Sequence, residues 1–192
     1  MADRVLIYGV TGSGKTTLAR QVAALTGLPW HSVDDLTWEP GWVTVAPEEQ
    51  RHRIAAICAG EQWILDTAYG QWVDVVLPRT ELIVGLDYPR WWSLSRLVRR
   101  TLMRAIDRRP ICNGNTESFR QAFSRDSIIV WHFQSFARKR DQMRSWAAGP
   151  AGRDVVLLKS PAATRRWLGR LAATAEAATA EAATAEAAER RV

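Results

Sequence analysis

The feature that most constrains this chain is an eight-residue stretch near its start, Gly9-Val-Thr-Gly-Ser-Gly-Lys-Thr16. It fits the spacing G-x-x-x-x-G-K-[ST] without a mismatch. The apolar run Arg4–Gly9 before it has the composition of a buried parallel strand, and the apolar residues of Lys15–Thr26 after it recur at helical spacing. A strand, a glycine-rich turn and a helix in this order predict a loop whose backbone N–H groups bind phosphate.

Each position of this loop has an expected role in binding a nucleotide. The glycines let the backbone wrap around a phosphate, Lys15 is expected to reach the β- and γ-phosphates, and the Thr16 hydroxyl is expected to bind Mg²⁺. The sequence therefore predicts ATP and Mg²⁺ as ligands. The expected contacts come from Gly9, Thr11, Gly12, Ser13, Gly14, Lys15, Thr16 and Thr17.

The rest of the chain alternates short apolar runs with segments of helical periodicity. Further strands are expected at 28–33, Trp63–Leu65, Leu82–Leu86 and Asp154–Leu158. Helices are expected at Pro47–Ala59, Arg90–Ile106 and Phe119–Trp146 and from Pro161 onward, with connectors at Leu36–Ala46 and Asp107–Ser118. This alternation predicts a three-layer α/β fold: a five-stranded parallel sheet with helices on both faces.

Carboxylates follow three of the expected strands, at the edge of the sheet where ligands bind in such folds. Asp66 is the candidate second anchor for Mg²⁺, with helix capping as the alternative. Asp34, next to Asp35, could accept a proton from a hydroxyl acceptor, or orient an acceptor that is a phosphate. The alternative for this pair is turn chemistry, and Asp87 is expected to end its strand and cap the next helix.

The basic residues are concentrated in one part of the chain. Only three of the 26 are lysine, and residues 90–144 hold twelve arginines and Lys139 against four acidic residues, a net charge of +9 within a total of +6. Arg96, Arg99, Arg100 and Arg104 fall on one helix face. We expect an arginine-rich helical lid at about 104–140 that closes on phosphates. The alternatives are a solvated basic face and a track for a nucleic-acid backbone.

The remaining features exclude several classes of protein. Two cysteines, Cys58 and Cys112, do not form a disulfide framework, and no apolar run is long enough for a signal peptide or a membrane span. A soluble cytoplasmic protein is therefore expected. The three histidines lack metal-ligand spacing and are expected to be structural or exposed. Of the ten tryptophans, Trp91, Trp92 and Trp131 are expected to pack in the core or at an interface rather than to stack on bases.

The end of the chain has a composition of its own. From Ala172 a five-residue Ala/Thr/Glu repeat begins, and this period leaves no apolar stripe on a helix. We expect one domain at 1–171 and a solvated tail, helical or disordered, at 172–192.

Five stretches carry a resemblance to a known family: Gly9–Thr17, Val33–Val43, Trp63–Tyr69, Leu86–Arg100 and Val155–Lys159. With them the chain resembles the adenylate-kinase-like P-loop proteins called topology modulation proteins, in the nucleoside-monophosphate and shikimate kinase group. The resemblance implies an ATP-dependent kinase in which Arg96 and Arg100 begin the lid and touch ATP. It also implies that Arg138 or Arg140 returns from the lid toward the nucleotide.

The chain departs from the family pattern on the acceptor side. The family reads W-x-x-D-G-N-Y where this chain has Asp66-Thr67-Ala68-Tyr69, and Gln71 and Val76 stand where arginines are expected, whereas Arg79 remains. Trp38–Trp42 would cover the acceptor. We expect transfer of the γ-phosphoryl group to a small acceptor, a nucleoside monophosphate or a hydroxylated metabolite. The alternatives are a nucleotide-dependent regulatory or nucleic-acid-associated protein and a family member without useful catalysis.

Overall fold

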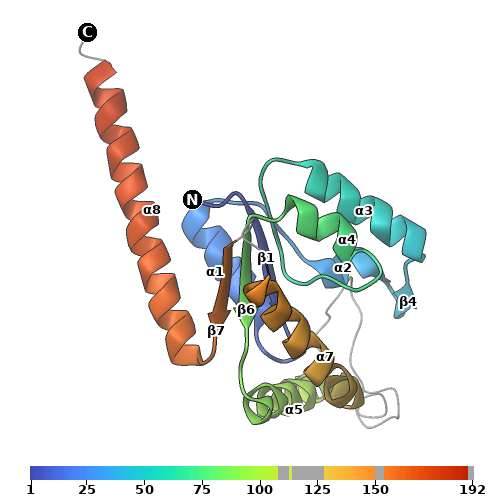
Figure 1. Ribbon diagram of the computed structural model, residues 1–192. Coiled ribbons are helices and arrows are strands. Elements are labelled where there is room, and N and C mark those ends of the chain that lie inside the picture. Colours follow the sequence, from blue (N-terminus) through green and yellow to red (C-terminus); the bar gives the residue numbers. More distant parts are fainter. Residues whose placement is uncertain (108–112, 114–127, 150–153, 190–192) are drawn as a thin grey trace.

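A computed structural model of the protein describes residues 1–107, 113, 128–149 and 154–189 (Figure 1). Its centre is a parallel sheet of five strands in the order β2-β5-β1-β6-β7. The strands are β1 (Arg4–Gly9), β2 (Trp30–His31), β5 (Trp63–Leu65), β6 (Leu82–Leu86) and β7 (Asp154–Leu158). The predicted three-layer α/β fold is confirmed.

The side chains of β1 alternate between two apolar clusters, as the period of two along a strand requires. Val5 and Ile7 join the cluster on the face covered by α1 (Lys15–Thr26) and α8 (Pro161–Glu189). Leu6 and Tyr8 join the cluster on the opposite face. That face is covered by α3 (Pro47–Ala59), α4 (Val73–Val76) and α7 (Ile128–Ala148).

A third group of elements lies near the carboxyl ends of the strands. The helix α5 (Arg90–Asp107) follows β6 and crosses that end of the sheet, and α2 (Val33–Thr37) follows β2. After α2 comes a small antiparallel hairpin, β3 (Trp38–Glu39) and β4 (Val43–Thr44). These elements surround the edge where the predicted site residues meet.

Most expected elements form as predicted, and the exceptions have local causes. The strand expected over 28–33 ends at His31, because the Ser32 hydroxyl accepts the Asp35 N–H and begins α2. The connector expected over Leu36–Ala46 instead forms the hairpin, whose turn contains Gly41 at φ 81° and Trp42 at φ 59°. The helix α4 and the 3₁₀ turn Leu77–Arg79 were not predicted, since each is too short to show a period.

Parts of two predictions lie outside the described residues. The structure describes only Asp107 and Asn113 of the loop expected at Asp107–Ser118, and only the part from Ile128 of the helix expected at Phe119–Trp146. The lid predicted at about 104–140 is therefore described at its two ends and at Asn113.

The helix α8 is continuous from the domain into the repeats and reaches Glu189. Trp167, Leu168 and Leu171 in its first turns pack against the cluster formed with α1, whereas Thr174 and Glu176 beyond them are exposed. Figure 1 shows the helix running past the sheet and away from it. The tail is thus helical over its described part, and the domain boundary at 171 stays a prediction.

Within the described residues, no helix combines the length and the apolar character that a membrane crossing requires.

Candidate functional site

The loop between β1 and α1 has the backbone conformation that its glycines allow. Gly12 and Gly14 have φ of 81° and 99°, in the left-handed region, and Gly14 is the N-cap of α1. The Ser13 hydroxyl donates to the Val10 carbonyl at 2.8 Å and fixes the turn. The first N–H groups of α1 therefore face the concave side of the loop, as a phosphate site requires.

Gly12 has a second reason to be glycine, which the sequence alone does not show. A Cβ at this position would lie 2.9 Å from the Leu97 Cβ and closer still to the Ser93 carbonyl oxygen, both on α5. The helix therefore packs directly onto the loop backbone, and it does so with the face that carries Arg96. The Arg96 guanidinium lies 3.1 Å from the position that a Cβ on Gly14 would take.

Lys15 lies inside the loop and faces two carboxylates. Its Nζ donates to the Val10 carbonyl at 3.1 Å. Burial lowers the pKa of Lys15, the negative charges of Asp34 and Asp66 oppose this, and the positive charge of Arg100 lowers the pKa further. The amine is thus held beside the acids from β2 and β5, as their positions after neighbouring strands predict.

Asp66 and Thr16 form a pair of oxygen donors at the mouth of the loop. The Thr16 hydroxyl donates to Asp66 Oδ2 at 2.8 Å, and the Val33 N–H donates to Oδ1 at 3.0 Å. Burial raises the pKa of Asp66, and these two hydrogen bonds lower it. A hydroxyl and a carboxylate side by side next to a phosphate loop are the ligands that Mg²⁺ uses in such sites, so the residues fit the predicted ion.

Asp34 lies in the first turn of α2 and is held by an aromatic hydroxyl. Tyr69 donates its hydroxyl proton to Asp34 Oδ1 at 3.0 Å, across from the strand end that carries Asp66. The bond leaves Oδ2 of the same carboxylate for a substrate. Asp34 and its neighbour Asp35 are both exposed, and no described side chain is hydrogen-bonded to the Asp35 carboxylate.

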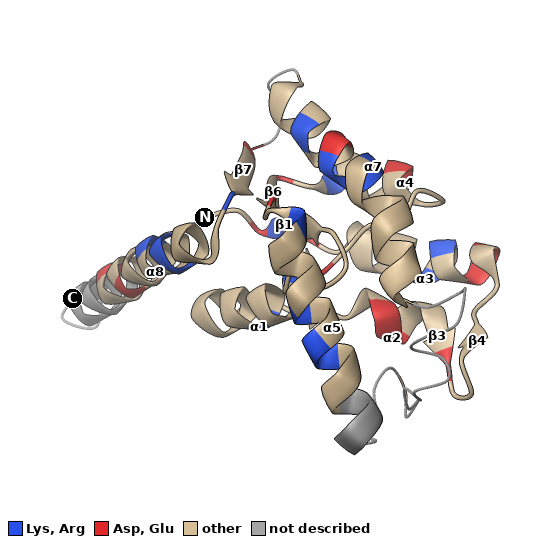
Figure 2. Ribbon diagram, turned by 90° about the horizontal axis from the view of Figure 1, so that it is seen from below, with Lys and Arg blue, Asp and Glu red and all other residues tan. Residues whose placement is uncertain are grey.

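The structure places the four predicted lid arginines in different surroundings. Arg96 lies over Gly14, and Arg100 lies close enough to Lys15 to lower its pKa. Arg138 is exposed on α7, with its guanidinium 5.8 Å from the centroid of the Trp131 ring. Figure 2 shows basic positions along both α5 and α7 and acidic positions on α2.

Arg140 has a partner that the sequence did not indicate. Its Nε donates to Asp87 Oδ1 at 2.7 Å, and Arg144 donates to Oδ2 at 2.8 Å, so Asp87 joins α7 to the end of β6. The expectation that Asp87 caps the following helix is wrong, because both carboxylate oxygens are used by these guanidinium groups. A nucleotide contact from Arg140 would require this ion pair to open, and it stays a prediction.

Two residues of α7 reach the site although sequence reasoning did not select them. His132 is fully buried, with Nδ1 3.0 Å from the Thr11 carbonyl oxygen of the loop. The Lys139 side chain is 6% exposed and lies near Lys15 and Asp34. One signal could have identified Lys139: in a chain with 23 arginines, a lysine marks a position with a distinct requirement.

A cavity of about 150 Å³ opens beside the loop between α1, α5 and α8. Gly14 and Thr17 line it on one side, Arg96 on another, and Thr164 and Arg165 on the third. The Tyr88 hydroxyl is hydrogen-bonded to Thr164 at 2.5 Å and closes the floor. The contribution of α8 to this cavity was not expected from the sequence.

The opposite side of the site is covered by the hairpin and by Asn113. The Asn113 Nδ2 donates to the carbonyl oxygens of Asp35 and Trp38, each at 2.8 Å. The Trp38 and Trp42 rings stand edge to face, 5.7 Å apart. Trp38–Trp42 thus follows α2 directly along the chain, and its role as a cover for the acceptor stays a prediction.

Arg79, the arginine that remains from the family's acceptor pattern, lies elsewhere. Its guanidinium donates to the carbonyl oxygens of Cys58 and Ala59 at the end of α3. Cys58 itself is buried, which raises the pKa of its thiol to about 11, as expected for a packing residue. Cys112 lies outside the described residues.

Comparison with known proteins identifies the fold. The sequence matches no protein-family model and no curated protein. Among solved structures, the chain is similar to a gluconokinase from Sinorhizobium meliloti 1021, with 16% identity, a TM-score of 0.52 and coverage of 93% of this chain and 97% of the other.

It is similar to two shikimate kinases as well. The one from Acinetobacter baumannii, in complex with shikimate, has 14% identity, a TM-score of 0.54 and coverage of 88% and 90%. The one from Aquifex aeolicus has 14% identity, a TM-score of 0.52 and coverage of 92% and 98%. The chain has the P-loop kinase fold, and at these identities the likeness shows the fold alone.

Proposed function

We propose that the protein is a phosphotransferase that moves the γ-phosphoryl group of ATP to a small acceptor bound near Asp34. One observation carries this proposal: Lys15 faces Asp34 and Asp66 at the mouth of the loop, so a phosphate-binding amine, a metal ligand and an acceptor-side carboxylate converge. The P-loop kinase fold of the molecule supports it.

The residues have distinct roles in this proposal. The loop N–H groups and Lys15 bind the phosphates of ATP, and the base lies in the cavity between Arg96 and Arg165. Thr16 and Asp66 would hold Mg²⁺, which would supply positive charge to neutralise the phosphates of ATP. Arg96 and Arg100 stabilise the charge that spreads over the transferred group.

Asp34 determines which acceptors can react. Tyr69 fixes one of its oxygens, and the other accepts a proton from an acceptor hydroxyl as the oxygen attacks phosphorus. The hairpin and Asn113 exclude water from this side, which limits hydrolysis of ATP. A nucleoside monophosphate, whose phosphate needs no base, would use Asp34 only for orientation.

The test is ADP release in the presence of Mg²⁺·ATP and a panel of nucleoside monophosphates and small hydroxylated metabolites. We expect at least one acceptor to raise ADP release above the rate with water. Lys15→Ala is expected to remove this activity. Asp34→Asn is expected to lower kcat by about 10²- to 10⁴-fold for a hydroxyl acceptor. Asp35→Asn, the exposed neighbour in the same helix, is the matched control and should retain activity.

The same screen separates this function from its alternative. If wild-type protein binds Mg²⁺·ATP but no acceptor raises ADP release, a regulatory or nucleic-acid-associated role replaces the kinase. Steep dependence of DNA binding on salt concentration would then support that role.

A further inference from the structure

Lys139 is a buried residue, 6% exposed, whose amine enters the site without a hydrogen bond or an ion pair to any described residue. It lies on α7 with Nζ 5.6 Å from the centroid of the Tyr69 ring and 6.0 Å from that of Tyr8. Both distances are near the outer limit of a useful cation–π contact. Both hydroxyl groups are already engaged, by Asp34 and by Gln142. The two tyrosine rings therefore lie beside the amine without accepting a hydrogen bond from it.

No hydrogen bond or ion pair holds this amine among the parts of the chain that the structure describes. The pKa of Lys139 is lowered to about 7, mainly by burial and then by the positive charge of Lys15; the negative charge of Asp34 opposes this, and Arg138 on the same helix adds to the lowering. The negative charge of Asp34, on α2, thus acts on the pKa of both lysines. Lys139 approaches Asp34 from α7, and Lys15 approaches it from the loop.

A buried amine without a hydrogen bond or an ion pair is costly, since a cation loses hydration on burial, and the more distant charge of Asp34 opposes this effect without cancelling it. If this position only filled space, a methionine of similar length would fill it without burying a charge. An anion placed between Lys15, Lys139 and Asp34 would supply the missing counterion. In the proposed reaction, the group that passes from the loop toward Asp34 is the γ-phosphoryl group.

Resting on the proposed function, we propose that Lys139 binds the γ-phosphoryl group of the donor nucleotide opposite Lys15 and takes up a proton as it does so. The ligand class is a phosphate dianion, whose charge favours the ammonium form. The arginines of α7 cannot act in this way, because a guanidinium keeps its proton at every pH at which the protein is folded. The choice of lysine within an arginine-rich helix follows from this difference.

The test compares the binding of Mg²⁺·ADP with that of the Mg²⁺ complex of the non-hydrolysable β,γ-imido analogue of ATP. Calorimetry at pH 8 in two buffers of different ionisation enthalpy gives the affinity and the protons taken up. Wild-type protein is expected to take up a larger fraction of a proton with the analogue than with ADP. Lys139→Met should bind the analogue about tenfold to a hundredfold more weakly, change ADP affinity less than about twofold, and lose the extra uptake.

Two further variants make the result specific. Lys139→Arg should keep most of the affinity for the analogue without the extra proton uptake, since its charge is permanent. Arg170→Met removes one exposed positive charge from α8 and should change neither quantity. Thermal unfolding of Lys139→Met should show a folded protein at least as stable as wild type at pH 7.

Each other result overturns the proposal. If Lys139→Met lowers the affinities for ADP and for the analogue equally, Lys139 is a structural residue. If it lowers neither affinity but raises the KM for the acceptor, Lys139 binds the acceptor instead. Failure of wild-type protein to bind either nucleotide would contradict the proposed function rather than this residue's role in it.

Discussion

At the scale of single residues, one glycine of the phosphate loop serves two purposes. Gly12 adopts a left-handed backbone conformation within the phosphate loop, and its missing side chain lets α5 approach through Ser93 and Leu97. Gly12 stands at a position that the motif leaves open, and the glycine-rich composition of the loop predicts the first purpose from sequence. Only the packing of α5, a helix that begins 78 positions later in the chain, creates the second.

Gly12→Ala measures the cost of backbone strain at positive φ together with the cost of overpacking against α5. Gly41→Ala in the β3–β4 turn measures the cost of backbone strain alone. Both glycines have φ of 81°, but a Cβ on Gly41 would meet no atom within 4 Å. We expect a loss of about 1–2 kcal/mol in the free energy of unfolding for Gly41→Ala. For Gly12→Ala we expect an additional loss of about 1–3 kcal/mol, because the new methyl group is overpacked against α5. Urea denaturation of both variants checks this, and equal losses would contradict the close approach of α5.

At the scale of the elements, the position of α7 depends on a buried ion pair. The side chain of Asp87 at the end of β6 is 1% exposed, and Arg140 and Arg144 approach it from one side of α7. The same helix holds His132 on the loop and Lys139 beside Lys15. Asp87 therefore holds the helix that brings Lys139 and His132 to the site.

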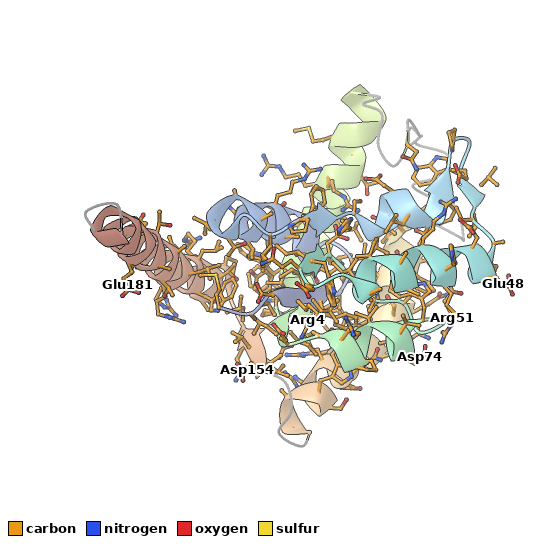
Figure 3. The ribbon with its side chains drawn as sticks, turned by 90° about the horizontal axis from the view of Figure 1, so that it is seen from above. Arg4, Glu48, Arg51, Asp74, Asp154 and Glu181 are labelled. Carbon is orange, nitrogen blue, oxygen red and sulfur yellow. The ribbon has the colours of Figure 1, made fainter. Side chains whose placement is uncertain are left out.

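Asp87→Asn is expected to lower the free energy of unfolding by about 1–3 kcal/mol, because it removes the buried anion that pairs with the half-buried Arg140 and the exposed Arg144. Asp74→Asn is the matched control. Asp74 pairs with Arg51 at 2.5 Å on the outer surface, where α3 and α4 meet (Figure 3). This exposed pair should contribute at most about 1 kcal/mol, less in high salt. Similar losses from both variants in urea denaturation would mean that α7 is not anchored by Asp87.

At the scale of the whole molecule, α8 belongs partly to the domain and partly to the tail. Its first turns complete the apolar face over α1 and line the cavity beside the loop through Thr164 and Arg165. The repeats continue the same helix without an apolar stripe. Alanine keeps them helical, and nothing in their period would direct them back to the sheet.

Truncation after Leu171 is expected to leave the melting temperature within about 2 °C of wild type and nucleotide affinity unchanged. Truncation after Arg166 also removes Trp167, Leu168 and Leu171, and should lower the melting temperature by more than about 5 °C, because these side chains pack on α1. Differential scanning calorimetry distinguishes the two. A large fall in melting temperature on truncation after Leu171 would contradict the domain boundary at 171.

The sequence by itself determined the features that depend on neighbouring residues. The loop motif, the strands Trp63–Leu65, Leu82–Leu86 and Asp154–Leu158, and the helix Pro47–Ala59 have the predicted bounds, since glycine spacing, apolar runs and N-terminal proline act locally. The order of strands and helices also determined that Asp34, Asp66 and the loop meet at one edge, because parallel strands share their direction.

Only the tertiary structure decided which long side chains face that edge. The basic residues of this segment look alike in sequence, yet Arg96 lies on the loop, Arg140 pairs with Asp87, and Lys139 lies near Lys15. The cause is the packing of α5 and α7 against the sheet, which selects one face of each helix. Such a selection depends on contacts between residues far apart in the chain, and no local pattern encodes it.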